Sequence, residues 1–330
     1  MGSTAETEAP DAGAVRAALA AAGEDPGEVE LSEIEGGASR QTFLVKAGGE
    51  PRFVLRREPA EGMSFATLDL ELAAIAAADT AGVAVARTVT AEPAGGAFGT
   101  GAGYLMEFVP GTSVAPRVLR RDELATARER LPGQLASALA QIHSVPAADV
   151  EGLGTSTDPA LEACDLWEMA LDGIGEPLPG VEAGLRWLRL NAPPPAEPRL
   201  VHGDFRLGNL IVDERGLAAV IDWELCHAGD PTEDLAWLCI RSWRFGNDEL
   251  PVAGLGELDG FLEVYEAAGG TRPDPERWRW WSAMGNVKWA VICARQAHDH
   301  LTGARPSAEL ASLGRRICEP EWDVLELVAG

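Results

Sequence analysis

The chain has 330 residues, of which 46% are hydrophobic and 24% charged, so it is long enough to bury a core in each of two lobes. Its formal net charge of -25 argues against a nucleic-acid partner, because binding to phosphate backbones uses clustered Lys and Arg. Five widely spaced cysteines predict unpaired, buried thiols in a reducing compartment. No apolar run reaches the roughly 18 residues that span a bilayer, and no signal peptide is visible. We therefore expect a cytoplasmic protein without nucleic-acid or membrane partners, whose oligomeric state stays open.

Short strands dominate the first third of the chain. Residues 1–12 are polar and acidic and predict a mobile tail, and a helix from Ala14 to Ala22 follows. Apolar runs between turn signals then predict strands, at Val29 to Ile34, Thr42 to Lys46, Arg52 to Arg56, Arg87 to Ala91 and Tyr104 to Phe108. One helix interrupts them from Leu68 to Ala78, and its predicted apolar side consists of Leu68, Leu72, Ile75 and Ala76. The pattern predicts a small, mostly antiparallel sheet with one helix.

The loop between the first two long strands is rich in glycine. It carries Gly36, Gly37 and Ser39. Glycine lets the backbone come close to a ligand, so such a turn can direct N–H groups at phosphates. A purely structural hairpin turn is the alternative.

From Arg120 onward the pattern is mainly helical. Helical spacing predicts a series of helices, at Glu123 to His143, Cys164 to Leu171, Val181 to Asn191, Leu255 to Ala268, Pro275 to His298, Ser307 to Cys318 and a last one ending at Val328. We expect Pro132 to split or kink the first of them. His143 is expected to be a core or capping residue, and the tryptophans that share a helical face with Lys288 are expected to be core.

One stretch, from Arg199 to Leu238, carries the chemistry. Three short apolar runs in it predict buried strands, and a polar residue closes each run. We therefore expect the polar residues Asp204, Asn209 and Asp222 to meet at the rim of one small sheet. An Asp in a loop, an Asn five residues later and a second Asp after the next strand are typical of phosphotransferases of the kinase type.

These three residues suit a metal-dependent transfer reaction. The carboxylate of Asp204 can accept the proton of an attacking hydroxyl. The oxygens of Asn209 and Asp222 are hard ligands of the kind that Mg²⁺ takes from proteins. The alternative is that the two carboxylates cap turns and that the amide closes a hairpin.

The longer motifs around these residues resemble a known family. HGDFRLGN at residues 202–209, IDWE at 221–224 and GDP at 229–231 followed by Asp234 resemble the aminoglycoside phosphotransferase and choline kinase family. The first two are most similar to the kinase-like domains attached to some acyl-CoA dehydrogenases. The resemblance extends from about residue 30 to about residue 300.

The resemblance implies an α/β fold of the protein-kinase-like type. It implies a nucleotide-binding lobe at residues 13–109, a hinge near Val109, and a helical lobe with the catalytic loop and the acceptor site at residues 110–330. The implied reaction moves the γ-phosphoryl group of ATP to a substrate hydroxyl with Mg²⁺, and GTP stays open as the donor.

In the helical lobe, the resemblance assigns the base to Asp204 and the metal to Asn209 and Asp222. Arg206, two residues after the base, is expected to reach the γ-phosphate. His202 is expected to fix the loop, and Asp230 and Asp234 are expected to hold it from the following segment.

In the nucleotide lobe, the resemblance makes Gly36, Gly37 and Ser39 phosphate contacts. Arg56 stands where kinases carry a Lys that pairs phosphates with a helix Glu, and Glu71 is the expected partner. Because a guanidinium is a planar fork and an ammonium a compact charge, this departure puts nucleotide affinity in doubt.

The implied hinge contacts adenine through its backbone. The resemblance assigns these contacts to Glu107 and Val109, with Met106 against the base.

Three functions follow from the sequence. The first is an aminoglycoside phosphotransferase-like enzyme that acts on a small molecule. The second is a kinase for a hydroxyacyl-CoA or another metabolite. The third, which only Arg56 favours, is a pseudokinase that binds nucleotide and transfers nothing.

Overall fold

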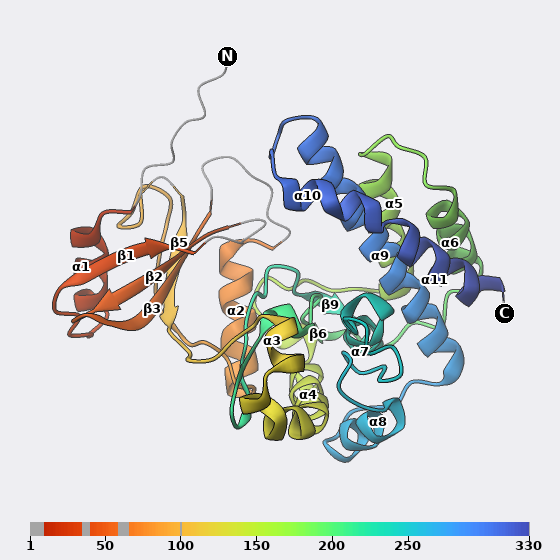
Figure 1. The fold of residues 1–330 in the computed structure, drawn as a ribbon, viewed down its shortest axis with the longest axis horizontal. Helices are drawn as coiled ribbons and strands as arrows, with labels where there is room; N and C mark the ends of the chain where they lie inside the picture. Colours follow the sequence, from red (N-terminus) through yellow and green to blue (C-terminus); the bar gives the residue numbers. More distant parts are fainter. Residues whose placement is uncertain (1–9, 35–39, 59–65, 100, 330) are drawn as a thin grey trace.

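The computed structural model describes residues 10–34, 40–58, 66–99 and 101–329. A five-stranded antiparallel sheet occupies one end of the molecule and a larger group of helices the other, with α2 between them (Figure 1). This is the predicted two-lobed α/β architecture.

The sheet has the strand order β1-β2-β3-β5-β4, and all of its pairings are antiparallel. Its strands are β1 (Val29–Glu33), β2 (Gln41–Ala47), β3 (Glu50–Arg57), β4 (Thr88–Glu92) and β5 (Gly103–Glu107). Alternation gives each strand two faces. On one face Phe53 and Leu55 pack with Leu19 of α1 (Ala12–Ala21). The other face carries Arg56 and turns toward α2 and the helices.

The helix α2 (Leu68–Thr80) buries a different side from the predicted one. Its buried residues are Glu71, Ala74, Ile75 and Ala78, whereas Ala76 is exposed and Leu68 and Leu72 are only partly buried. The predicted side was chosen from apolar residues alone and so does not include Glu71. In the structure Glu71 is buried against Arg40 and Arg56, so the buried side of α2 is rotated relative to the predicted side.

The helical part agrees with the predicted series of segments. Its helices are α3 (Ala115–Arg120), α4 (Ala125–Ser144), α5 (Pro159–Asp172), α6 (Pro179–Leu190), α7 (Thr232–Cys239), α8 (Leu258–Ala267), α9 (Pro275–Leu301), α10 (Ala308–Leu313) and α11 (Cys318–Ala329). Pro132 lies inside α4 without dividing it. Of the two tryptophans on the Lys288 face, Trp281 is a core residue and Trp278 is only partly buried, whereas Trp280, predicted off that face, is also almost fully buried.

The three apolar runs of the central stretch form strands, but not one sheet. β6 (Arg199–Val201) pairs with β9 (His227–Gly229), and β7 (Leu210–Asp213) pairs with β8 (Gly216–Val220). The predicted single sheet is wrong, because β9 has too few apolar residues to be recognised as the partner of β6.

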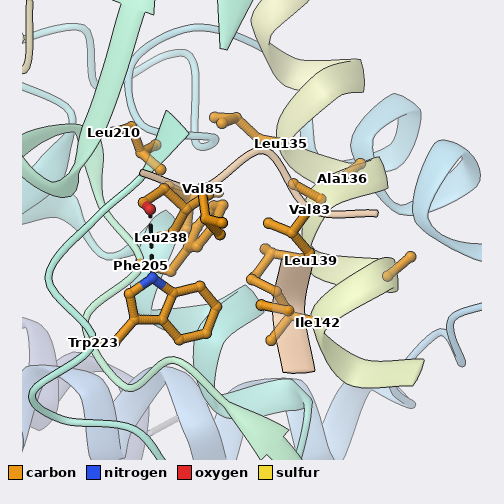
Figure 2. Close-up of a cluster of buried hydrophobic side chains, with 14 of the residues drawn as sticks. Val83, Val85, Leu135, Ala136, Leu139, Ile142, Phe205, Leu210, Trp223 and Leu238 are labelled. Atoms are coloured by element: carbon orange, nitrogen blue, oxygen red, sulfur yellow. Dashed lines mark hydrogen bonds between the residues drawn. The ribbon is translucent and has the colours of Figure 1, made fainter. Parts of the chain in front are cut away.

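A hydrophobic cluster fixes this central stretch against α4. Figure 2 shows Leu139 and Ile142 of α4 directed toward Phe205 and Trp223, which lie within the HGDFRLGN and IDWE motifs. The indole N–H of Trp223 also donates to the carbonyl of Val220, with 3.4 Å between the atoms. The loops that bear the polar residues are therefore mounted on a packed core.

The segment after β5 connects the sheet to the β7–β8 hairpin. Thr112 and Val212 exchange two backbone hydrogen bonds of 2.9 and 3.0 Å. At Gly111, φ is +148°, and an added Cβ would lie 2.7 Å from the Val212 carbonyl oxygen. Only glycine fits this close approach.

The cysteines are unpaired, as predicted, but not all are buried. Cys318 is exposed, and the other four are buried free thiols. Across the described ranges, no helix is both long and apolar enough to cross a bilayer.

Candidate active site

The loop that begins the HGDFRLGN motif is held by Asp234 at the start of α7. Its carboxylate accepts hydrogen bonds from the backbone N–H groups of His202 and Gly203, at 2.8 and 2.9 Å. Gly203 has a φ of +78°, and an added Cβ would lie 2.3 Å from the carbonyl oxygen of Leu225. The loop conformation therefore requires a glycine, which is Gly203, and a hydrogen-bond acceptor for two backbone N–H groups, which is Asp234.

His143 supports Asp234 from α4. Its Nε2 lies 3.2 Å from the Asp234 carboxylate, and its Nδ1 lies 2.8 Å from the hydroxyl of Tyr265. Burial alone would raise the pKa of Asp234, but the hydrogen bond and charge of His143 lower it. Asp234 is thus kept as the anion that the loop requires.

His202 fixes the loop as a neutral imidazole. Its Nδ1 accepts the backbone N–H of Asp204 at 3.1 Å, and its Nε2 donates to the carbonyl of Ile221 at 3.1 Å. Burial lowers the pKa of His202, and this outweighs the nearby carboxylates. The ring joins the loop to the end of the β7–β8 hairpin.

Asp204 accepts hydrogen bonds from three side chains. Asn209 donates from Nδ2 at 2.6 Å, Arg206 from Nε at 3.0 Å, and Trp237 from its indole N–H at 2.9 Å. The guanidinium of Arg206 also stacks on Trp243, with 4.9 Å to the ring centroid. The structure thus directs Arg206 to the carboxylate of Asp204.

Asn209 and Asp222 lie at the same end of the β7–β8 hairpin. The backbone N–H of Ile221 donates to the carbonyl of Asn209 at 3.0 Å, and Asp222 follows with a left-handed φ of +69°. A non-glycine residue in this region is uncommon and occurs often at functional sites. The structure brings Asp204, Asn209 and Asp222 to one place, as the sequence predicts.

Arg56 reaches this place from the sheet. Its Nη2 lies 2.7 Å from Oδ1 of Asp222, and 3.8 Å from the carboxylate of Glu224. Burial would raise the pKa of Asp222, but the charge and hydrogen bond of Arg56 lower it. Asp222 is therefore held as a carboxylate beside a permanent cation.

Glu71 is the meeting point of two arginines. Its side chain is fully buried, with Arg56 3.6 Å away and Arg40 in direct contact through Nη1. The hydroxyl of Tyr104 donates to it at 2.7 Å. Glu71 lies beside Arg56, as predicted, but it also pairs with Arg40, which was not predicted from the sequence. The position of Arg40 directly after the glycine-rich loop was the sequence feature that could have indicated a role for it.

A buried lysine lies behind the loop. Lys288 of α9 donates to the carbonyl of Gly203 and forms an ion pair with Glu233, with 3.0 Å between Nζ and Oε1. Burial alone would raise the pKa of Glu233, but Lys288 and His227 lower it to about 2. The sequence places Lys288 on an aromatic helix face but does not predict its contact with the loop. A single lysine on such a face was the sequence feature that could have indicated a buried charge.

The oxygens at this site suit Mg²⁺. Because Asn209 directs its amide N–H at Asp204, its carbonyl oxygen is the part that can bind a cation. Asp222 pairs with Arg56 through one carboxylate oxygen, and its side chain is 29% exposed. Mg²⁺ takes few protein oxygens and keeps waters or phosphates in its other positions. The two residues fit this requirement.

The predicted nucleotide contacts are placed only in part. Gly36, Gly37 and Ser39 lie outside the described residues. The N–H of Phe108 bonds to the carbonyl of Arg52 in β3, so the neighbouring Glu107 and Val109 direct backbone groups to the opposite side. There the N–H of Glu107 already donates to the carbonyl of Arg87, with 2.9 Å between the atoms. Met106 is buried against the core.

Comparison with known proteins finds a matching family model and relatives that are much longer than this chain. A family model described as the phosphotransferase enzyme family matches residues 30–281. Mouse acyl-CoA dehydrogenase family member 10 is 27% identical over 316 residues, which cover 90% of this chain. Human acyl-CoA dehydrogenase family member 11 is 25% identical over 308 residues, which cover 88% of this chain. The chain spans 29% and 39% of the length of these two relatives.

Solved structures share the fold. A Ralstonia eutropha protein assigned provisionally to the aminoglycoside phosphotransferases has a TM-score of 0.77 at 22% identity, covering 97% of this chain and 98% of its own. A mutant of aminoglycoside phosphotransferase APH(4)-Ia, in a ternary complex with ADP and hygromycin B, has a TM-score of 0.61 at 18% identity, covering 92% and 96%. These TM-scores show a kinase-like fold, as predicted. Because the family model covers most of its length, the chain belongs to the phosphotransferase enzyme family.

Proposed function

We propose that this protein is an ATP-dependent phosphotransferase that acts on a hydroxyl group of a small molecule. The observation that carries the proposal is the contact of Asp204 with Asn209 at the hairpin end where Asp222 pairs with Arg56. A base, an amide oxygen and a second carboxylate from separate turns are the parts that phosphoryl transfer requires.

In the proposed reaction, Asp204 is the base. The acceptor hydroxyl loses its proton to Asp204 as its oxygen forms a bond to the γ-phosphorus of ATP, and the bond from that phosphorus to the β-phosphate oxygen breaks to release ADP. Asn209, Arg206 and Trp237 hold the carboxylate in one orientation. Orientation of this kind lowers the barrier, because the base needs no rearrangement before the proton moves.

Asn209 and Asp222 are the residues proposed to hold Mg²⁺. The ion, when bound, neutralises charge on the transferring phosphoryl group. Arg56 and the glycine-rich loop are proposed to bind the nucleotide phosphates, and the carbonyl of Glu107 with the N–H of Val109 is proposed to pair with adenine. Residues 13–109 then form the nucleotide lobe, with the hinge near Val109.

The direct test replaces the base. Asp204→Asn should lower turnover by about 10²- to 10⁴-fold, because it removes the proton acceptor. Transfer is detected as the mass gain of one phosphoryl group over a panel of alcohols, and nucleotide binding as a rise in melting temperature with Mg²⁺ and ATP. The variant should still bind nucleotide.

The matched control is Asp213→Asn at the other end of the same hairpin, where the carboxylate bonds to the backbone and side chain of Arg215. It should keep normal turnover. Normal turnover in Asp204→Asn would refute the assignment of the base. Nucleotide binding without transfer to any acceptor would favour the pseudokinase instead.

A second candidate concerns the acceptor. The side chains that contact Asp204 are an amide, a guanidinium and an indole. The indole of Trp237 and the ring of Trp243 below Arg206 are almost fully buried, whereas the Arg206 side chain is partly exposed. Arg206 would repel the amines of an aminoglycoside and would attract an anionic group of an acceptor. This favours a hydroxyacyl thioester or hydroxy acid over a polyamine.

The two acceptor classes are separated by charge. Paired assays should compare an aminoglycoside with a hydroxyacyl-CoA and with the free hydroxy acid. We expect a larger kcat/KM for the anionic acceptors, and a raised KM for them in Arg206→Gln. An aminoglycoside as the better substrate would reject this second candidate and leave the phosphotransferase proposal intact.

A further inference from the structure

Two residues outside the predicted site converge on the proposed base. The indole N–H of Trp237 in α7 donates to Oδ1 of Asp204 at 2.9 Å. The Nζ of Lys288 in α9 lies 4.6 Å from the centroid of the same indole ring. Lys288 also donates to the carbonyl of Gly203, the residue before Asp204. It therefore contacts both the backbone and a side-chain partner of the base.

The lysine is committed to this place. Only 3% of it is exposed, and its ion pair with Glu233 places a second buried charge on α7. The α7 and α9 helices lie against each other (Figure 1). Buried charged pairs of this kind contribute little net stability compared with apolar residues, so stability alone is a poor reason for them.

We propose that Trp237 and Lys288 are positioning residues for Asp204, an inference that rests on the phosphotransferase function proposed above. A cation over the face of an indole withdraws electron density from the ring, which makes its N–H a stronger donor. The stronger donor holds Oδ1 while Asn209 holds Oδ2, so the carboxylate of Asp204 is fixed in one orientation. The hydrogen bond from Lys288 to the carbonyl of Gly203 fixes the backbone directly before Asp204.

Two variants separate the parts of this arrangement. Trp237→Phe keeps an aromatic ring for the lysine and removes the N–H donor. Lys288→Met keeps the length of the side chain and removes the charge. Each should lower kcat by about tenfold, the lower end of what outer residues contribute at other sites, and the KM for ATP should stay within about twofold of the wild-type value.

A spectroscopic measurement tests the same contact without turnover. The chain has 10 tryptophans, and the indole N–H signal that disappears in Trp237→Phe identifies Trp237 in proton–nitrogen spectra. That signal should move in Asp204→Asn and move in the same direction in Lys288→Met. Trp280→Phe is the matched control, because its indole N–H donates to Leu188 on another helix. It should leave kcat and the Trp237 signal unchanged.

The outcomes separate this inference from the proposed function. A Trp237 signal that stays in place in both Asp204→Asn and Lys288→Met would overturn the inference, whether or not the protein transfers phosphate. A moving signal in a protein without transfer would support the contact and reject the function. If Lys288→Met does not fold, Lys288→Met with Glu233→Gln removes both charges and gives the same test.

Discussion

Arg56 and Asp222 form an ion pair with 2.7 Å between Nη2 and Oδ1, and this pair joins the sheet to the proposed metal site. The guanidinium comes from β3, and the carboxylate lies two residues after the end of β8. A Mg²⁺ ion at the proposed site would have to share that carboxylate with Arg56 or displace Arg56 from it. The residue that departs from the kinase pattern therefore contacts a proposed metal ligand.

Replacing Arg56 by Lys should strengthen the apparent binding of Mg²⁺. A lysine cannot reproduce the planar fork of the guanidinium, so its hold on Asp222 is weaker. Partly exposed ion pairs contribute up to about 1 kcal/mol, which corresponds to about a fivefold change in affinity. The measurement is the Mg²⁺ concentration that gives half of the ATP-induced rise in melting temperature, which should fall by up to about fivefold.

Arg52→Lys is the control for this prediction. Arg52 lies on the same strand but bonds to Glu24 and the Asp25 carbonyl on the outer side of the sheet. Its replacement should leave the Mg²⁺ requirement unchanged. An unchanged or higher requirement in Arg56→Lys would show that Arg56 does not compete with the metal.

Glu71→Gln should destabilise the fold. The substitution keeps an acceptor for the hydroxyl of Tyr104 but leaves Arg40 and Arg56 without the carboxylate between them. Loss of one partner of a buried ion pair costs about 3 to 5 kcal/mol. The free energy of unfolding from urea titration measures this loss.

A second acid on the same helix provides the comparison. Asp69 is exposed in the first turn of α2, where a carboxylate contributes about 0.3 to 1 kcal/mol through the helix dipole. Asp69→Asn should therefore cost far less than Glu71→Gln. Equal losses in the two variants would mean that the buried pair with Arg40 adds nothing to stability.

Local patterns predicted the strands and the polar ends of the site. The apolar runs that precede Asp204 and Asp222 and the run that follows Asn209 are short and bounded by turn residues, so their position along the chain fixed where these polar residues would be. Antiparallel pairing in the β7–β8 hairpin then placed Asn209 beside Ile221. Contacts between segments that are adjacent in the sequence can therefore be predicted from it.

Contacts between segments that are far apart in the sequence could not be predicted. Lys288 meets Gly203 across 85 positions and His143 meets Asp234 across 91. Helical periodicity shows which residues share a face, but not which element that face meets. Trp237 is a partial exception, because it lies three positions after Asp234 on α7 and so shares the face that holds the loop.

Gly111→Ala should destabilise the junction between the sheet and the β7–β8 hairpin. The added methyl group would lie 2.6 Å from a side-chain carbon of Ile211 and 2.7 Å from the Val212 carbonyl oxygen. We expect a loss of about 1 to 3 kcal/mol, typical of strain at such a backbone position. Gly133→Ala in α4 is the control with the opposite sign, because its Cβ meets open space and alanine favours a helix by about 1 kcal/mol. Urea titration of both variants decides, and a stabilised Gly111→Ala would contradict the close approach.

His227 should make stability depend on pH near neutrality. Its Nδ1 faces the carbonyl of Leu225 at 2.9 Å and its Nε2 faces Glu233 at 3.1 Å, so both ring nitrogens need a proton. Burial would lower the pKa of His227, and so does the Lys288 charge, but the Glu233 carboxylate raises it overall. A raised pKa in the folded state stabilises the protein fully below the unfolded value of about 6.5, and the gain disappears as pH rises through the folded pKa.

Melting temperatures of the wild type and His227→Gln at a series of pH values measure this contribution. The difference between them should be largest below about pH 6.5 and should shrink toward more alkaline pH. In a Glu233→Gln background the raising carboxylate is absent, and burial with the Lys288 charge lowers the pKa of His227, so the pH dependence of the difference should reverse. A difference that grows with rising pH would mean that burial, and not the ion pair with Glu233, sets the charge of His227.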